Sequence, residues 1–465
     1  MGNAVLAAED VDRTPRPAVS KLARWRAAVA RLFPQAERAK AARGWVVTWY
    51  VTAFAAAVAY LLLIPAGRSR LTHVWAEDGG RFLLDSRTLP WWSNLVTPYE
   101  GYQHSLPRLA AELVSTLPLT WAAAGLAVAA ALLRAGVALL VFTASGGFLR
   151  SLPVRLGLAA LVVVAPVGNS ETLDNLANFH WFALYGVFWL LLWRPASRWV
   201  CAMAAVLVFL AVTTSPLALL LAPLALARFA LPGRRQALIT AAFCLGAAVQ
   251  FVTVLLATRT QYFNEPVNVK AAALAGVVRV ALVAFTGSEG VAEIYSVFVY
   301  WPAFVALAIT LVLVGAALRW GGGPRRLLAF VALGYSVGYI ALSLTQNWRI
   351  GLAVFYPGVV MDAQRYSVAP SLFLLTAVAV GLDLVPRARW ARVGMVAARV
   401  AVAAVLITGV VRQLPISTGT LTGIHWDQAV ADARRDCASA PGKATARIVH
   451  EPAGWYITMP CDRMR

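Results

Sequence analysis

The chain has 465 residues, of which 60% are hydrophobic and only 13% charged, with a formal net charge of +20 and a mean hydropathy of +0.69. Soluble domains have about 45–50% apolar and about 25% charged residues, so this composition excludes an ordinary water-soluble fold. Because the apolar residues form long continuous runs, we predict an all-α, polytopic bundle of transmembrane helices. The basic residues lie in short loops between these runs, so we expect no nucleic-acid partner.

The N-terminal segment, residues 1–44, precedes the first apolar run and is predicted to be a cytoplasmic tail. Residues 21–43 alternate apolar side chains with arginines and lysines, which is typical of a basic amphipathic helix lying on an anionic membrane surface. A solvated tail that ends in basic residues before the first span fits the segment equally well.

The transmembrane domain is predicted to cover residues 45–411. A window of about 20 residues gives 11 spans. They are 45–64, 119–143, 154–168, 179–193, 199–213, 217–231, 237–257, 291–318, 327–344, 366–384 and 393–411. A further apolar run, 271–286, carries Arg279.

The orientation of the spans follows from their loops, because cytoplasmic loops are rich in arginine and lysine. With the N-terminus inside, five short loops face the cytoplasm and are basic. They contain Arg150 and Arg155; Arg194 and Arg198; Arg228, Arg234 and Arg235; Arg319, Arg325 and Arg326; and Arg387, Arg389 and Arg392. The opposite loops contain most of the acids. This pattern holds only if 271–286 does not cross, so we expect that run to be interfacial or re-entrant, and the C-terminus to lie outside.

The C-terminal tail, residues 412–465, is predicted to be a small extracytoplasmic module. Cys437 and Cys461 are its two cysteines, and the other two lie in predicted spans. A location outside a bacterial plasma (inner) membrane favours a disulfide between Cys437 and Cys461, with two free thiols as the alternative.

The first outer loop, residues 65–118, contains the adjacent carboxylates Glu77 and Asp78, followed by two glycines and surrounded by aromatic residues. Neighbouring carboxylates disfavour ionising together, so one of them can keep a raised pKa and accept a proton near neutrality. They could instead hold a divalent cation beside a phosphate, and no other cofactor follows from the sequence. Alternatively, one of them caps a short helix that starts near Gly79.

Other candidate binding residues lie in the first loop and in the outer loops 169–181, 258–290 and 345–365. Histidine, arginine and asparagine side chains suit the binding of sugars and phosphates, although they can also cap helices, pair with acids or contact lipid headgroups. The candidates are Arg81, His104, Arg108, Asn178, His180, Arg349 and Arg365.

With about 11 spans, a cytoplasmic N-terminus and an acidic pair in a long first outer loop, the chain resembles the GT-C superfamily of membrane glycosyltransferases. The resemblance rests on topology and on Glu77-Asp78, although these acids are adjacent rather than spaced as in the usual motif. It implies transfer of a sugar from a polyprenyl-phosphate donor to an envelope glycan or lipid acceptor at the outer face. It also implies that Asp78 or Glu77 is the general base, and that 271–286 borders a groove for the donor lipid. We expect Arg349 or Arg365 to hold the lipid phosphate by charge.

Two other functions remain open. The chain could be a transporter or flippase of a lipid-linked glycan, with Arg134, Arg279 and Arg399 lining a pathway inside the apolar runs. It could also be an envelope polysaccharide polymerase or ligase that uses outer arginines and His180.

Overall fold

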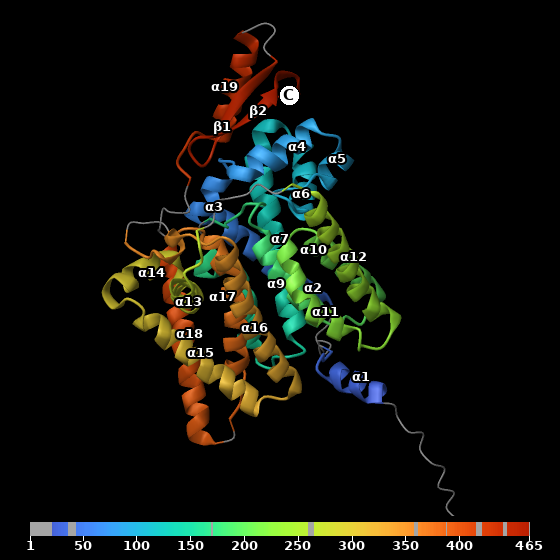
Figure 1. Cartoon of the computed structure of the whole chain (residues 1–465), viewed down its shortest axis with the longest axis vertical. Helices are drawn as coiled ribbons and strands as arrows, with labels where there is room; N and C mark the ends of the chain where they lie inside the picture. The colour runs from blue at the N-terminus through green and yellow to red at the C-terminus, as the bar shows by residue number, and fades with distance from the viewer. Residues whose placement is uncertain are drawn as a thin grey trace, which may run out of the picture.

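The computed structural model describes residues 21–35, 43–168, 171–258, 265–357, 361–386, 388–414, 421–439 and 444–464. Long helices form an elongated bundle, and a small module with two strands lies at one end of it (Figure 1). The predicted all-α, polytopic fold is therefore confirmed.

The helices follow the apolar runs closely. Those before residue 200 are α1 (Lys21–Arg31), α2 (Arg43–Leu63), α3 (Pro65–Arg70), α4 (Leu84–Thr88), α5 (Trp91–Val96), α6 (Ser105–Ser115), α7 (Ala122–Ser145), α8 (Leu152–Val164), α9 (His180–Leu192) and α10 (Arg198–Val212). The later ones are α11 (Ala222–Arg228), α12 (Arg234–Leu256), α13 (Val269–Val277), α14 (Val283–Phe298), α15 (Trp301–Trp320), α16 (Gly323–Gln346), α17 (Val368–Leu382), α18 (Arg389–Gln413) and α19 (Trp426–Ser439).

Among the described residues, 8 helical stretches are long and apolar enough to cross a membrane, and four shorter apolar helices accompany them. The long stretches are Gly44–Leu63, Leu119–Ser145, Arg234–Leu256, Val269–Phe298, Trp301–Trp320, Gly323–Gln346, Gln364–Leu382 and Arg389–Gln413. The shorter ones are Leu152–Gly168, His180–Leu192, Arg198–Val212 and Pro216–Arg228. Each predicted span coincides with one of these helices, apart from 291–318.

The stretch Val269–Phe298 has the length of a span, but it contacts α16 and α18 near the C-terminal ends of these helices. A Cβ atom on Gly276 would lie 3.6 Å from Leu344, near the C-terminal end of α16. At the kink, Gly287 has a φ of 72° and lies against Gln413, the last residue of α18. Because α16 and α18 both end on the predicted outer side, Val269–Phe298 runs along that side, as the basic loops require.

The predicted span 291–318 is wrong at its start, because the chain turns sharply before α15. Val299 has a φ of 52°, and α15 begins two residues later at Trp301. An apolar run joins the two helices in the sequence, and hydropathy alone therefore cannot locate the break. The residues before the turn belong to α14.

Arginines inside the apolar runs donate hydrogen bonds to backbone carbonyls. Arg134 is 2% exposed and donates to Val162 (2.7 Å), Val163 (3.0 Å) and Gly168 (2.8 Å). These carbonyls lie at the C-terminal end of α8, where a helix leaves acceptors without partners. Arg134 therefore caps a helix, which is a structural role that the pathway hypothesis did not consider.

Helix α1 covers only the first half of the predicted amphipathic segment 21–43, and residues 36–42 lie outside the described part of the chain. It packs near the ends of α9 and α11 (Figure 1). Arg194 donates to the carbonyl of Phe33 at 3.0 Å, and Phe33 is 1% exposed. The tail is thus attached to the bundle.

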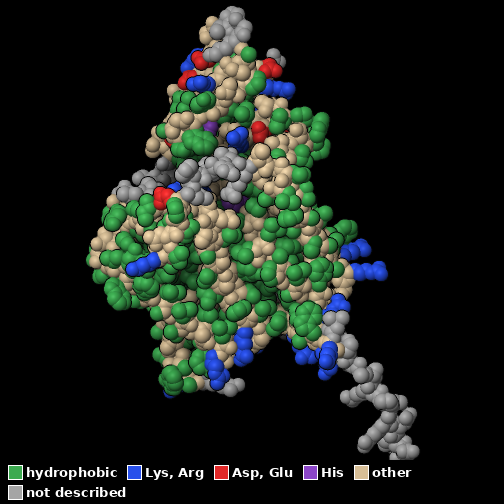
Figure 2. Space-filling view, in the orientation of Figure 1, with side chains coloured by type: hydrophobic (Ala, Val, Ile, Leu, Met, Phe, Trp, Pro, Cys, Tyr) green, Lys and Arg blue, Asp and Glu red, His purple; other side chains and the backbone are tan. Residues whose placement is uncertain are grey.

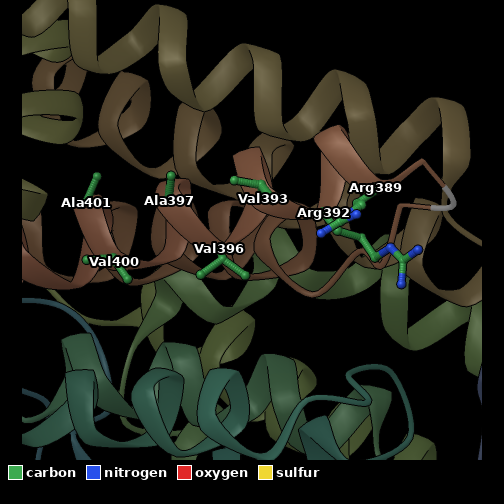
Figure 3. A pocket seen from close by; sticks show the side chains of 7 residues that line it. All are labelled: Arg389, Arg392, Val393, Val396, Ala397, Val400 and Ala401. Atoms are coloured by element: carbon green, nitrogen blue, oxygen red, sulfur yellow. The ribbon is translucent and has the colours of Figure 1, made fainter.

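Charged side chains separate along the bundle, with many Lys and Arg at the lower end and Asp and Glu near the upper end (Figure 2). A shallow groove of about 730 Å³ runs along α18 at the lower, basic end, from Arg389 to Ala401 (Figure 3). The acidic pair lies at the other end of the molecule.

The C-terminal module consists of α19, β1 (Thr445–His450) and β2 (Trp455–Pro460). The two strands are antiparallel, with Thr445 opposite Pro460, and a disulfide joins Cys437 to Cys461. The module shares one hydrophobic cluster with the first outer loop, which contributes Phe82 and Leu83. A tail too small to bury a core alone therefore completes one against the loop.

Candidate active site

The acidic pair lies in a strained turn at the outer end of the bundle. Ala76 has a φ of 32°, a left-handed conformation that costs an L-residue about 1–2 kcal/mol. Glu77 follows, and Asp78 begins a short π-helical segment, Asp78–Leu83. The turn separates the two carboxylates, so that they have different surroundings.

Asp78 is 2% exposed, and its carboxylate binds the backbone of the second outer loop. Its Oδ2 accepts the N–H of Leu176 and its Oδ1 accepts the N–H of Ala177, both at 2.8 Å. The sequence-based alternative, a cap of the following helix, is not what this side chain does. Instead, Asp78 links two loops that are about 100 residues apart.

Burial raises the pKa of Asp78 to about 7, against the two backbone N–H groups, which lower it. The nearby charge of Glu77 raises this pKa further, and Arg70 lowers it. This agrees with the prediction that one member of the pair has a raised pKa. The carboxylate of Asp78 is nevertheless buried, and both of its oxygens already accept backbone N–H groups.

Glu77 is half-buried and therefore more accessible than Asp78. Tyr99 lies close enough to Glu77 for the charge of this carboxylate to act on it, and burial together with this charge raises the pKa of the tyrosine. A tight turn presents Tyr99: Glu100 and Gly101 have φ values of 48° and 83°, and Tyr99 and Tyr102 bond across them. Two positive φ values are typical of a type I′ hairpin turn, which explains the glycine.

Arg365 brings positive charge to the same place. It pairs with Glu171 through Nη1, and its backbone N–H also donates to Glu171 at 3.2 Å. The guanidinium lies 5.1 Å from the centre of the Tyr366 ring, and it is close enough to Glu77 to interact electrostatically. The third outer loop therefore contacts the second through Arg365 and Glu171, and the charge of Glu77 acts on the same guanidinium.

Arg349 lies further out and pairs with Asp362. Both its Nε and its Nη2 donate to this carboxylate, with Nη2 at 2.5 Å, and the hydrogen bond lowers the pKa of Asp362. Arg279, from the helical stretch Val269–Phe298, donates to the backbone carbonyls of Asp362 (2.6 Å) and Ala363 (3.2 Å). Arg279 thus fixes the backbone of the loop that carries Arg365.

Two histidines converge on the carbonyl of Ala177. His104 is fully buried, with Nδ1 at 2.7 Å from the Thr214 carbonyl and Nε2 at 3.2 Å from that of Ala177. Burial lowers the pKa of His104 well below its usual value, and a neutral ring has one N–H, which the shorter contact with Thr214 takes. The Nδ1 of His180 lies 2.8 Å from the same Ala177 carbonyl. His180 therefore supports the loop that Asp78 binds through a hydrogen bond, whereas the His104 ring only lies against it.

The other predicted residues lie away from Glu77 or serve the fold. Arg81 is exposed, whereas Arg108 is buried and donates to Asp85 at 2.9 Å and to Asn94. The backbone N–H of Asn178 donates to the side chain of Asn175 at 2.9 Å. These three residues are therefore not brought together with the acidic pair.

Two charged residues beneath the acidic pair were not among the predicted site residues. Arg70 is 2% exposed and lies 4.6 Å from the centre of the Trp75 ring, and burial lowers its pKa to about 10. Asp174 is 4% exposed, and burial raises its pKa to about 6 against the charges of Arg134 and Arg70. The sequence contained one indication of a special role for Arg70. Arginines are enriched in cytoplasmic loops, whereas Arg70 lies in the first loop predicted to be outside.

No protein-family model matches the chain, and no curated protein matches it either. Among solved structures, it is similar to arabinofuranosyltransferase AftD from Mycobacteria, studied by cryo-EM, with 16% sequence identity and a TM-score of 0.46. The match covers 87% of this chain and 29% of that chain. The chain thus spans less than a third of the length of that transferase.

The site combines a half-buried carboxylate, a nearby guanidinium and a rigid support. The residues that the structure describes include no group of three His, Cys, Asp or Glu side chains placed to hold a metal ion. Backbone N–H groups point at both oxygens of Asp78, which suits an anion and not a cation ligand. The pair Glu77 and Asp78 therefore does not fit a divalent cation well, and the chemistry considered below uses the side chains alone.

Proposed function

We propose that the chain is a GT-C-type glycosyltransferase of a bacterial plasma membrane. It moves a sugar from a polyprenyl-phosphate donor to an envelope glycan or lipid acceptor at the outer face. The observation that carries this proposal is that Asp78 binds the backbone of the second outer loop and that Glu171 of this loop pairs with Arg365, which gathers the acidic turn and this arginine at the outer end of the bundle. A polyprenyl chain stays in the bilayer while its sugar phosphate lies at headgroup depth, which suits a site at the outer end of the bundle.

In this proposal Glu77 is the general base and Asp78 is a positioning residue. Glu77 accepts the proton of the acceptor hydroxyl as that oxygen attacks the anomeric carbon and the bond to the donor phosphate breaks. Tyr99 lies close to this carboxylate. Asp78 holds the second loop through Leu176 and Ala177, which keeps Glu171 and His180 in place.

Arg365 is proposed to stabilise the leaving phosphate. Its ion pair with Glu171 uses one of the five N–H groups of a guanidinium, so further donors remain for phosphate oxygens. Charge that develops on the leaving group is stabilised most by donors fixed in advance. The stretch Val269–Phe298, which supports this loop through Arg279, would border the lipid part of the donor.

Sugar transfer by the full chain in lipid nanodiscs tests the proposal. The protein is given radiolabelled sugars as polyprenyl phosphates or as nucleotide conjugates, together with envelope glycan and lipid acceptors. We expect transfer from at least one polyprenyl-phosphate sugar and from no nucleotide sugar. Absence of transfer from every polyprenyl donor, combined with movement of a lipid-linked glycan across proteoliposome membranes, would refute the proposal in favour of a flippase.

A further inference from the structure

The C-terminal module lies directly on the turn that carries the acidic pair. The backbone of Glu451 brackets Trp75: Ala76 donates its N–H to the Glu451 carbonyl at 2.5 Å, and Glu451 donates to Val74 at 3.1 Å. This parallel bridge joins residues about 375 positions apart. It ends one residue before Glu77.

The bridge binds Ala76, the residue of the turn with a strained backbone conformation. Ala76 has a φ of 32°, which an alanine adopts only when the surrounding structure holds it there. Its N–H is the group that Glu451 accepts. The module therefore contacts the one backbone position that decides where the Glu77 carboxylate points.

The C-terminal module packs against the glycine pair that follows the acids. A Cβ atom on Gly79 would lie 3.1 Å from Nε2 of His450, and one on Gly80 would lie 3.9 Å from the Trp455 ring. A side chain at Gly79 would crowd both Val74 and His450, whereas one at Gly80 would make an ordinary van der Waals contact with Trp455. The sequence feature Glu-Asp-Gly-Gly thus contains both the acids and the surface on which their support rests.

Trp426 attaches the module to the outer loop a second time. Its ring is 1% exposed, its Nε1 donates to the Leu119 carbonyl at 2.7 Å, and its backbone N–H donates to Thr72 at 2.8 Å. The Cys437–Cys461 disulfide then joins the helix that begins at Trp426 to the end of β2. Both attachments therefore belong to one cross-linked unit.

We propose that this module is a strap that holds the Ala76–Glu77 turn in its active conformation, with Trp426 as its principal positioning residue and the disulfide as its lock. The proposal rests on the proposed function for the role of Glu77, whereas the strap contact itself does not depend on it. Because the module lies about 375 residues after the turn that it holds, the site is complete only after the module has folded and its disulfide has formed.

Hydrogen exchange of the full chain in nanodiscs, without substrate, tests the contact. In Trp426→Ala we expect amides 74–80 to exchange about tenfold faster or more, since exchange reports local opening, while the amides of α7 stay unchanged. Trp426→Phe keeps the packing and should fall between this variant and the wild type. Arg435→Gln is the matched control, because its side chain is on the same helix, 75% exposed, and pairs with Asp432.

Kinetics on the same samples test the positioning role. We expect Trp426→Ala to lower kcat about tenfold with the KM for the donor changed less than about threefold, as for a misplaced base. Cys437→Ser/Cys461→Ser, or reduction of the folded wild type, should act in the same direction, with Cys244→Ser as control.

Unchanged exchange at 74–80 in both Trp426→Ala and the double cysteine variant would overturn the strap, as would faster exchange with an unchanged kcat. A wild type that transfers no sugar would refute the proposed function instead, and exchange alone would then decide whether the strap exists.

Discussion

Arginines in the body of the bundle and arginines at its outer end have the same chemistry but opposite surroundings. Arg134 is buried, and all three of its donor nitrogens meet backbone carbonyls at the end of α8. Arg365 is 34% exposed and pairs with a carboxylate that is 20% exposed. An arginine whose donors all bind backbone carbonyls therefore has a structural role, whereas a partly exposed arginine with donors to spare is able to bind a phosphate. The position of the arginine inside or outside an apolar run does not distinguish the two.

Arg228 has a structural role like that of Arg134. It is 1% exposed and donates to the carbonyls of Leu191 (2.6 Å) and Trp193 (2.7 Å), at the end of α9. A guanidinium with several donors suits several carbonyls that a helix end leaves without partners. An arginine inside an apolar run is therefore weak support for a transport pathway in this chain.

The largest effect is expected on stability. Replacing Arg134 with methionine keeps an unbranched but shorter side chain and leaves the carbonyls of Val162, Val163 and Gly168 without this donor, so the free energy of unfolding should fall by about 3 kcal/mol. The folded fraction should keep its kcat within about threefold. Denaturant titration and transfer assays on the same preparation check both. If the Arg134→Met variant lost sugar transfer but kept its stability, Arg134 would act on the substrate, and the distinction between structural and outer arginines would be wrong.

At the outer end, Arg365→Gln should leave stability nearly unchanged and lower kcat/KM about 10- to 100-fold, because a donor to the leaving phosphate is lost. Arg412→Gln is the matched control, since Arg412 is also on the outer side, is 62% exposed and pairs with Glu293 at 3.0 Å. The control should change kcat/KM less than about twofold. Equal effects in the two variants, measured by steady-state transfer, would mean that Arg365 has no special role.

A smaller effect is expected from pH. The folded pKa of Asp78, about 7, lies above that of a free aspartate, so stability contributed by the protonated form is lost as pH rises from about 4 through about 7. Between pH 5 and pH 8 the wild type should lose about 2.5 kcal/mol relative to Asp78→Asn, which does not titrate. Unfolding curves at both pH values check this, and a relative gain for the wild type would show that the two N–H groups outweigh burial.

Sequence reasoning predicted the membrane helices and their arrangement well, because apolar runs and basic loops record both directly. It placed the start of α15 ten residues early, since no charge marks the turn at Val299. The site was less predictable. Spacing in the sequence could not reveal that Asp78 faces Leu176, that Arg365 pairs with Glu171, or that Glu451 bonds to Ala76, because each contact joins distant segments.

The two acids offer the sharpest comparison inside the site. They are neighbours in the sequence, yet Asp78 is bound on both oxygens by backbone N–H groups while Glu77 is half-buried beside Tyr99 and Arg365. A base must reach the acceptor hydroxyl, and we propose Glu77 for this role because it is the more exposed of the two acids.

The most direct test compares the kcat of Glu77→Gln and Asp78→Asn, with donor binding measured separately on each and Glu293→Gln as control. We predict that Glu77→Gln lowers kcat about 1,000-fold with donor binding kept, since general-base catalysis contributes about 100- to 10,000-fold. Asp78→Asn should keep more activity and bind the donor less tightly, as a loosened loop would. The reverse order, with Asp78→Asn inactive and Glu77→Gln active, would contradict the assignment of Glu77 as the base.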